Sequence, residues 1–304
     1  MSIKHTVTTD LDGNTNYEWQ VRYKGQNYGW SEWSTPTSFT TLDFVTGPGS
    51  STLNYDSVTD TGYYGVVNSA DLCDGSTLAS NIGLSAGTLQ YNDAGWLKFY
   101  VGPSADCNKD GVEKVLFIAK QTIRNDVSWN DIYNAGAVYG TGNYGPANSG
   151  SNVTQDAQVT IGGKTYKVRL LTGSATDPAA EGYNNQQCSD DAGGGSEWND
   201  LLYRVHTDVP DCGDPTIGMP GGNDTIRHGG PQDGDNWATF TNAELQVYYS
   251  DAGDGTYCWC QERGNNTSRR VSRGFFGVAS FSTRLADYSN SNIGWRPCLE
   301  LVQP

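Results

Sequence analysis

The sequence predicts an α+β fold for most of the 304-residue chain, preceded by a small all-β piece. Glycine is very frequent (38 residues), and tyrosine and tryptophan are abundant (18 and 9), a composition that favours strands joined by many turns. Two segments, 128–135 and 196–205, carry helix signals, while short apolar runs elsewhere read as strands. We therefore expect two helices packed with short antiparallel strands.

Residues 1–41 form the small β-piece. Alternation over 17–23 predicts one strand, and the sequence WSEWS at 30–34 precedes a second strand that ends near Thr41. This unit resembles the last three strands of a fibronectin type III domain, with its Trp-Ser-x-Trp-Ser box. The resemblance implies that Trp30 and Trp33 stack against Arg22 and Lys24. It covers about half a domain, so we expect a structural spacer that continues a longer protein.

Residues 42–60 are rich in glycine, serine and threonine, which predicts a linker, and residues 61–304 read as one globular domain. Strands are expected at 115–119, 165–171, 257–260 and 295–302. The first helix would begin at a cap formed by Ser128 or Asn130. The second would follow Ser196, with apolar positions 198, 201, 202 and 205 on one face.

Charge and composition exclude several classes of function. A net charge of −15 argues against general nucleic-acid binding, and no run of 18 apolar residues predicts a membrane span. The first residues lack the apolar core of a signal peptide, so we expect synthesis in the cytoplasm, with any export by lysis or another route. Seven irregularly spaced cysteines predict buried or unpaired thiols, with Cys188 and Cys212 the best candidates for a bridge.

The stretch 264–294 has an unusual composition. Small polar residues, arginine and aromatics alternate there without a clean period, and lysine, glutamate, glutamine, methionine and tryptophan are missing. Five arginines occur from Arg263 to Ala286, and no acidic residue lies among them. These arginines could bind a small anionic ligand, or they could simply be a solvent-exposed face. An orderly strand follows at once. Such a pattern is typical of a binding surface carried by a conventional framework.

Five motifs together identify a family resemblance: FIAKQ (117–121), SWND (128–131), EWNDLLYRV (197–205), WCQE (259–262) and IGWRP (293–297). The region 61–304 resembles the C-type-lectin-fold variable proteins of diversity-generating retroelements, which occur in phages, archaeal viruses and some cellular genomes. In that family a C-terminal variable region, here about 257–295, binds a target. An error-prone reverse transcriptase rewrites its adenines, and AAC-type codons cannot reach the five missing residue types.

The resemblance assigns the variable, ligand-binding face to fourteen residues that we expect to be exposed. They are Gly264, Asn265, Asn266, Thr267, Ser268, Ser272, Gly274, Phe275, Phe276, Ser280, Ser282, Arg284, Leu285 and Tyr288. Trp198, Trp259, Trp295 and Arg296 are expected to be buried framework. The alternative is an ordinary glycine-rich group of loops.

Metal and cofactor signals are weak, and the sequence predicts neither. The segment 106–113 begins like a calcium loop, but Phe117 stands where its last acidic ligand would be, so Asx turns in a hairpin are favoured. No Glu-Pro-Asn or Gln-Pro-Asp triplet indicates calcium-dependent sugar binding.

An enzyme is the alternative class, although we expect no catalytic residues. Cys258, Cys260 and Cys298 lack an evident base partner and read as core. Glu197 and Asp200 stand three residues apart on the second predicted helix, where they are expected to face water or to cap the helix. The acidic loops at 208–235 are the remaining candidate for a tail-fibre or secreted carbohydrate-active enzyme.

The resemblance predicts a receptor- or ligand-binding display protein whose C-terminal face is diversified for attachment of a virus to host cells. The expected location is the virion surface, such as a tail fibre, or another extracellular surface. A host surface protein or glycan is the expected partner, with other virion or fibre subunits as further partners. Neither nucleic acid binding nor membrane insertion is expected.

Overall fold

The computed structural model describes residues 16–25, 29–40, 45–146, 150–179, 195–206, 237–247, 256–264, 266–275, 277–278 and 280–303. The chain divides into two compact units. The first consists of Met1–Thr46 with Gln303–Pro304, and the second is Gly47–Val302. The segment expected as a linker, 42–60, therefore spans the boundary, and its end contributes a strand to the larger unit.

The first unit is built from two antiparallel strand pairs. β1 (Asn16–Trp19) pairs with β4 (Thr37–Thr40), and β2 (Lys24–Gly25) pairs with β3 (Gly29–Trp30). The guanidinium of Arg22 lies 4.5 Å from the ring centre of Trp30 and 4.4 Å from that of Trp33. The ammonium of Lys24 lies 5.7 Å from the Trp30 ring. The predicted stacking of cations on the two tryptophans is confirmed.

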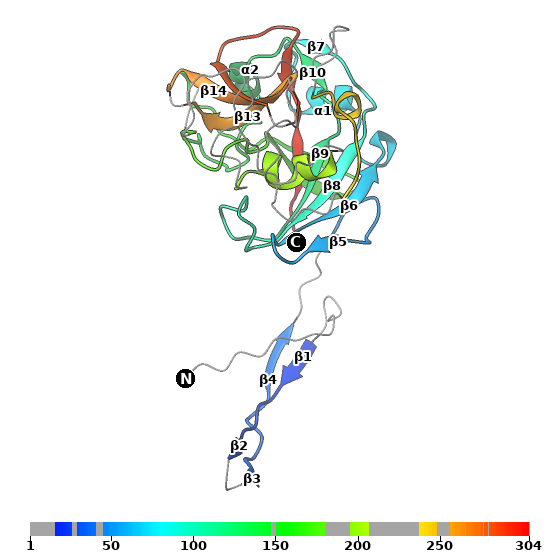
Figure 1. The fold of residues 1–304 in the computed structure, drawn as a ribbon, viewed down its shortest axis with the longest axis vertical. Helices are drawn as coiled ribbons and strands as arrows, with labels where there is room; N and C mark the ends of the chain where they lie inside the picture. Colours follow the sequence, from blue (N-terminus) through cyan, green and yellow to red (C-terminus); the bar gives the residue numbers. More distant parts are fainter. Residues whose placement is uncertain are drawn as a thin grey trace. The chain divides into compact units, whose positions relative to one another are not determined.

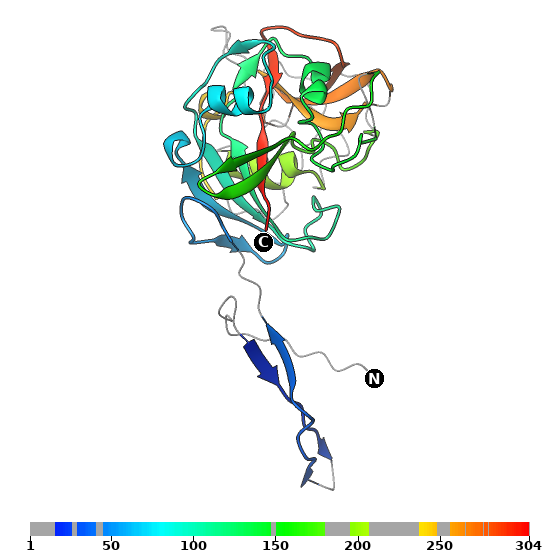
Figure 2. The ribbon, with the colours of Figure 1, turned by 180° about the vertical axis from the view of Figure 1, so that it is seen from behind.

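The larger unit contains a seven-stranded sheet with the order β11-β12-β17-β9-β8-β6-β5. Its strands, in chain order, are β5 (Asn54–Asp56), β6 (Thr61–Val67), β8 (Trp96–Val101), β9 (Lys114–Ala119), β11 (Gln158–Ile161), β12 (Lys164–Arg169) and β17 (Cys298–Leu301). All of their pairings are antiparallel. The C-terminal strand β17 lies between β9 and β12, and Figure 2 shows it in red running through the middle of the unit.

A second sheet of six strands has the order β15-β14-β13-β16-β10-β7. Its strands are β7 (Thr88–Leu89), β10 (Arg124–Asn125), β13 (Tyr257–Arg263), β14 (Arg269–Gly274), β15 (Phe281–Leu285) and β16 (Ile293–Trp295). β13 and β16 run parallel, whereas the other neighbours are antiparallel. Figure 1 shows β13 and β14 in orange at the top of the unit, beside α2 (Trp129–Asn134).

Helices in the described residues are short, and their starts follow local sequence signals. The Ser128 hydroxyl accepts from the amide of Asp131, whose carboxylate accepts from the amide of Ser128, so the predicted cap closes into a capping box. The other elements are η1 (Ser69–Asp71), α1 (Gly75–Asn81), the π-helical η3 (Trp198–Leu202), the 3-10 turn η4 (Tyr203–Val205) and α3 (Asn242–Leu245). None of the described helices has the length and apolar character needed to cross a bilayer.

The predicted α+β, C-type-lectin-like fold class is wrong: the structure is mostly β, with 33% strand and 13% helix, in several sheets. The second predicted helix is present after Ser196, as the π-helical η3 followed directly by the 3-10 helix η4. Several strands, such as β7, β10 and β16, have only two or three residues and are defined by pairing with segments far away in the sequence. Strands that short have no readable period, because one or two alternations do not separate a strand from a turn.

Candidate functional site

The exposed part of the predicted binding face is the turn between β13 and β14, together with the end of β15 and the loop after it. Asn266, Thr267 and Ser268 form an exposed turn, in which the Asn266 side-chain oxygen accepts from the Ser268 amide (3.1 Å) and hydroxyl (2.8 Å). Leu285 is exposed and Tyr288 is half-buried. The amide of Ala286 donates to the oxygen of Ser268 at 3.0 Å, which holds the loop beside the turn.

We define the tip surface as the six predicted face residues that solvent reaches here. They are Asn266, Thr267, Ser268, Arg284, Leu285 and Tyr288. Asn265 and Phe276, also predicted for the face, lie outside the described residues.

Six other members of the predicted face are buried, which corrects the expectation that the whole face meets solvent. They are Gly264, Ser272, Gly274, Phe275, Ser280 and Ser282. Ser272 and Gly274 belong to β14, an interior strand between β13 and β15, whereas Ser282 lies on the edge strand β15. An interior strand exposes side chains only if one face of the sheet is free, and both faces are covered here.

One face of these strands carries stacked cations and aromatic rings. The guanidinium of Arg270 lies 4.3 Å from the ring centre of Trp129 in α2, and that of Arg284 lies 4.8 Å from the ring of Tyr257. The Phe275 ring stacks on Tyr257 with centroids 4.6 Å apart. Burial lowers the pKa of Arg270 from its ordinary value. These contacts close this face over the length of β14.

The opposite face packs into the main core. Val271 and Phe281 belong to the core cluster, together with Trp198 of η3. Between them Arg273, also buried, donates to the oxygen of Gly173 at 2.7 Å and to the side-chain oxygen of Asn199 at 2.9 Å. An arginine that the sequence grouped with an exposed basic cluster is thus part of the interior.

The predicted framework is confirmed by burial. Trp198, Trp259, Trp295 and Arg296 are each exposed by no more than 1%. The indole of Trp198 donates to the oxygen of Val278 at 2.7 Å, in the turn between β14 and β15, at the end of these strands remote from the tip surface. The strands that carry the tip surface are therefore anchored in a buried framework.

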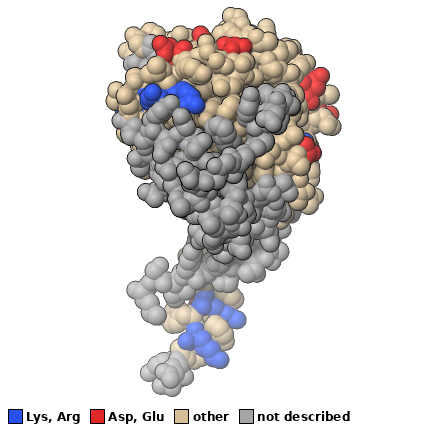
Figure 3. Space-filling view, turned by 45° about the horizontal axis from the view of Figure 1, so that its top comes forward, with Lys and Arg blue, Asp and Glu red and all other residues tan. Residues whose placement is uncertain are grey.

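The remaining basic side chains near the tip surface are bonded to acidic or carbonyl groups. Arg263 pairs with Asp177 at 2.9 Å, and Arg269 donates to the oxygen of Thr283 at 2.9 Å. Figure 3 shows one Lys/Arg group at the top of the large unit, with Asp and Glu side chains nearby. The acid-free arginine run in the sequence does not form a continuous basic patch among the described residues, because other segments supply carboxylates.

Glu197 and Asp200 are both buried, so the expectation that they face water is wrong. Glu197 forms a two-pronged ion pair with buried Arg169, at 2.6 and 2.7 Å, and accepts from the amide of Thr172. Asp200 is also buried and accepts from the amide of Gly195, and burial raises its pKa to about 6. The reason is that η3 lies inside the unit, with Trp198 through Leu202 all buried.

The cysteines and the half-matched calcium loop behave as the sequence favours. Cys258, Cys260 and Cys298 are buried and free, and burial raises the pKa of the Cys260 and Cys298 thiols. In the loop, the Asp110 carboxylate accepts from the amide of Val112 at 3.0 Å, an Asx turn. Cys188, Cys212 and the acidic loops at 208–235 lie outside the described residues.

Sequence reasoning missed a charged network centred on Arg169. Its guanidinium bonds Glu197, as above, and the carboxylate of Glu300 at 2.9 Å, while Lys167 bonds the same carboxylate at 2.7 Å. These cations lower the pKa of Glu300 to about 2, against the desolvation that would raise it. The available signal was a glutamate inside the apolar run of β17, which needs a partner when buried.

Comparison of the chain with protein-family models, with curated proteins and with solved structures gave no match.

Proposed function

We propose that this chain is a receptor- or ligand-binding display protein whose target is bound by the tip surface. We further propose that its coding stretch is diversified by adenine-directed mutagenic retrohoming, as in the variable proteins of diversity-generating retroelements. The observation that carries the proposal is the coincidence of two features at one place. The tip surface is exposed on a buried framework, and it lies in the stretch that lacks the five residue types unreachable from AAC codons.

The tip surface has the chemistry of an adaptable binding site. Arg284, Leu285 and Tyr288 supply charge and contact area, while Asn266 and Ser268 offer small polar groups. Large rigid side chains dominate binding energies, and small polar ones adapt their hydrogen bonds, as in antibody loops. A host surface protein or glycan is the proposed target, and attachment of a virus to host cells is the proposed role.

The structure narrows the set of positions that can vary. Substitution at exposed sites usually changes the free energy of unfolding by no more than about 0.5 kcal/mol, whereas core changes cost several times more. Ser272 and Ser282 are fully buried and lie opposite each other on β14 and β15, so larger residues there would overpack the surrounding core. We therefore assign diversification to the tip surface and a supporting role to the buried serines.

Sequencing the DNA around the gene tests the genetic half of the proposal. We expect a reverse-transcriptase gene beside a near-copy of the stretch that encodes residues 264–294, with adenines at the positions where the two copies differ. In a growing population, codons for the tip surface should vary and those for Ser272 and Ser282 should stay constant. A gene neighbourhood without any such near-copy contradicts diversification.

A binding assay tests the recognition half on whole cells of the host that the gene neighbourhood identifies. The tip variant combines Arg284→Ala, Leu285→Ser and Tyr288→Ala. The control variant changes exposed residues away from the tip, Leu89→Ser, Val112→Ala and Tyr144→Ala. We expect both to fold by circular dichroism and only the tip variant to lose cell binding. Equal binding by both variants would assign recognition to another surface.

A further inference from the structure

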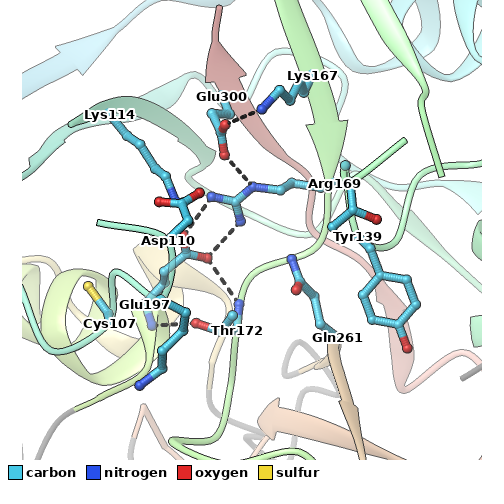
Figure 4. Close-up of a pocket in the computed structure, with 13 residues that line it drawn as sticks. Cys107, Asp110, Lys114, Tyr139, Lys167, Arg169, Thr172, Glu197, Gln261 and Glu300 are labelled. Carbon is cyan, nitrogen blue, oxygen red and sulfur yellow. Dashed lines mark hydrogen bonds and ion pairs between the residues drawn. The ribbon is translucent and has the colours of Figure 1, made fainter. Parts of the chain in front are cut away.

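A second candidate site lies in the large unit, away from the tip. It is a cavity of about 450 Å³, within the roughly 300–1,000 Å³ usual for small-molecule sites. Its walls come from the loop before β9, from β9, β12 and β17, and from the turn at 139–141 (Figure 4). We call it the charged cleft; the residues that carry the argument are Lys109, Lys114, Tyr139, Lys167, Arg169 and Glu300.

The floor of the charged cleft is a preorganised ion network. Arg169 is buried at its centre, and Figure 4 shows Glu197 and Glu300 on either side, bonded to its guanidinium. Lys167 bonds Glu300, and Lys114 pairs with Asp110 at 2.9 Å. Each carboxylate is thus matched by at least one cation. Groups held by several bonds in a low dielectric keep their positions, which suits a ligand site.

The charge inventory leaves one cation in excess. Four basic side chains line the cleft against three carboxylates, in a chain whose net charge is −15. The lining cation that pairs with none of these three carboxylates is Lys109, which is exposed, donates to the backbone oxygen of Asp106 at 2.8 Å and also acts to lower the pKa of nearby buried Asp200. Among the residues that the structure describes it forms no ion pair. One anionic group of a ligand would complete this inventory.

The hydrogen-bond inventory describes the rest of the ligand. An ammonium has three donors, and Lys109, Lys114 and Lys167 each use one within the described residues. The carboxylate oxygens of Glu300 each accept one bond and have a further lone pair. The cleft therefore offers both donors and acceptors, which suits hydroxyl groups because each hydroxyl both donates and accepts.

Tyr139 bounds the cleft on the opposite side of Arg169 from Asp110 and Lys114 (Figure 4), and its ring is buried, with 6% exposed. The exposed part of the cleft is therefore mostly polar. We propose that the charged cleft binds a small polyhydroxylated monocarboxylate, that is, a sugar acid, with its carboxylate on Lys109. This site is independent of the tip surface and of the proposed display function.

Isothermal titration calorimetry of the full chain with glucuronate tests the proposal. Glucose has a similar ring without the carboxylate, and acetate has the carboxylate without the ring. We expect glucuronate to bind and both controls to bind at least about tenfold more weakly. Methyl β-glucuronide tests whether the natural ligand is a free sugar acid or the end of a glycan. If this glycoside binds, the ligand is the end of a glycan; if it does not bind, the ligand is the free sugar acid.

Two lysine variants locate the bound carboxylate. Lys109→Gln should weaken glucuronate binding about tenfold, because a hydrogen bond to a charged group contributes on that order. Lys164→Gln removes the same charge from the start of β12 outside the cleft and should change affinity less than about twofold. Circular dichroism checks that both fold. Absence of binding, acetate binding as tight as glucuronate, or equal weakening by both variants each overturns the proposal.

Discussion

The same pairing of arginine with tryptophan occurs in both units of the molecule, but in different surroundings. Arg22 stacks on Trp30 and Trp33 in the first unit, where the two rings are 55% and 53% exposed. Arg270 stacks on Trp129 in the larger unit at a similar distance, and both are buried. A cation–π contact contributes roughly 0.5–1 kcal/mol when exposed and about 2 kcal/mol or more when desolvated. Similar geometry thus stabilises the two units very differently.

The surroundings of each arginine–tryptophan stack also determine which elements the stack holds together. In the larger unit Trp129 bonds the oxygen of Cys260 through its indole at 3.1 Å and stacks on Tyr133, so it ties α2 to β13. In the first unit the stack lies on two short strand pairs, and isolated hairpins of that size are marginal in water. We conclude that the stack in the larger unit is part of a packed core, whereas the stack in the first unit lies on a small two-stranded ribbon.

The largest expected effect is that of Trp129→Ala. Removing a fully buried indole leaves a cavity, so the free energy of unfolding of the larger unit should fall by about 3–5 kcal/mol. Urea unfolding followed by circular dichroism measures this loss. A loss below about 1 kcal/mol would mean that the buried and exposed stacks are equivalent, which would break the comparison.

An intermediate effect depends on pH and concerns the buried region alone. Burial raises the pKa of Glu262 to about 8 from an ordinary value of 4.5. Between these values the folded state binds the proton more tightly than the unfolded state, so Glu262 makes the stability fall as pH rises. Glu262→Gln removes this titration and keeps an oxygen that can accept from the amide of Gly173.

We therefore expect the melting midpoints of Glu262→Gln and the parent to agree near pH 4, and the variant to melt several degrees higher near pH 8. Asp200, whose pKa is also raised, titrates in both proteins, so its contribution cancels in the difference. Thermal melting across this range is the measurement. A gap between the two midpoints that does not change with pH would exclude a raised pKa for Glu262.

The smallest expected effect is that of Trp33→Ala. Its half-exposed ring contributes an exposed cation–π contact, so the loss should stay at or below about 1 kcal/mol and be confined to the first unit. Amide hydrogen exchange should speed up around Ser31 and Ser34, whose amides bond Tyr23 and Val21. Faster exchange in β13 or β14 as well would show that the two units are energetically coupled.

Local signals in the sequence predicted local structure correctly. The Ser128 cap depends on atoms three residues apart, and the strand at 115–119 on an unbroken apolar run, so neighbouring residues suffice for both. The tryptophan framework was also predictable, because large apolar residues in strand-like runs are rarely left in water. The fold class was not predictable in this way, since strands such as β10 and β16 exist only through their distant partners.

By itself, the sequence determined the unusual composition of the stretch 264–294, because composition and the missing residue types are properties of the stretch alone. Only the tertiary structure decided which residues of this stretch meet solvent. Ser268 and Ser272 are the same residue type four positions apart, yet one lies in an exposed turn and the other is buried in an interior strand. The difference arises from the packing of α2 on one face of β14 and of η3 on the other. Neither contact can be read from the residues near either serine.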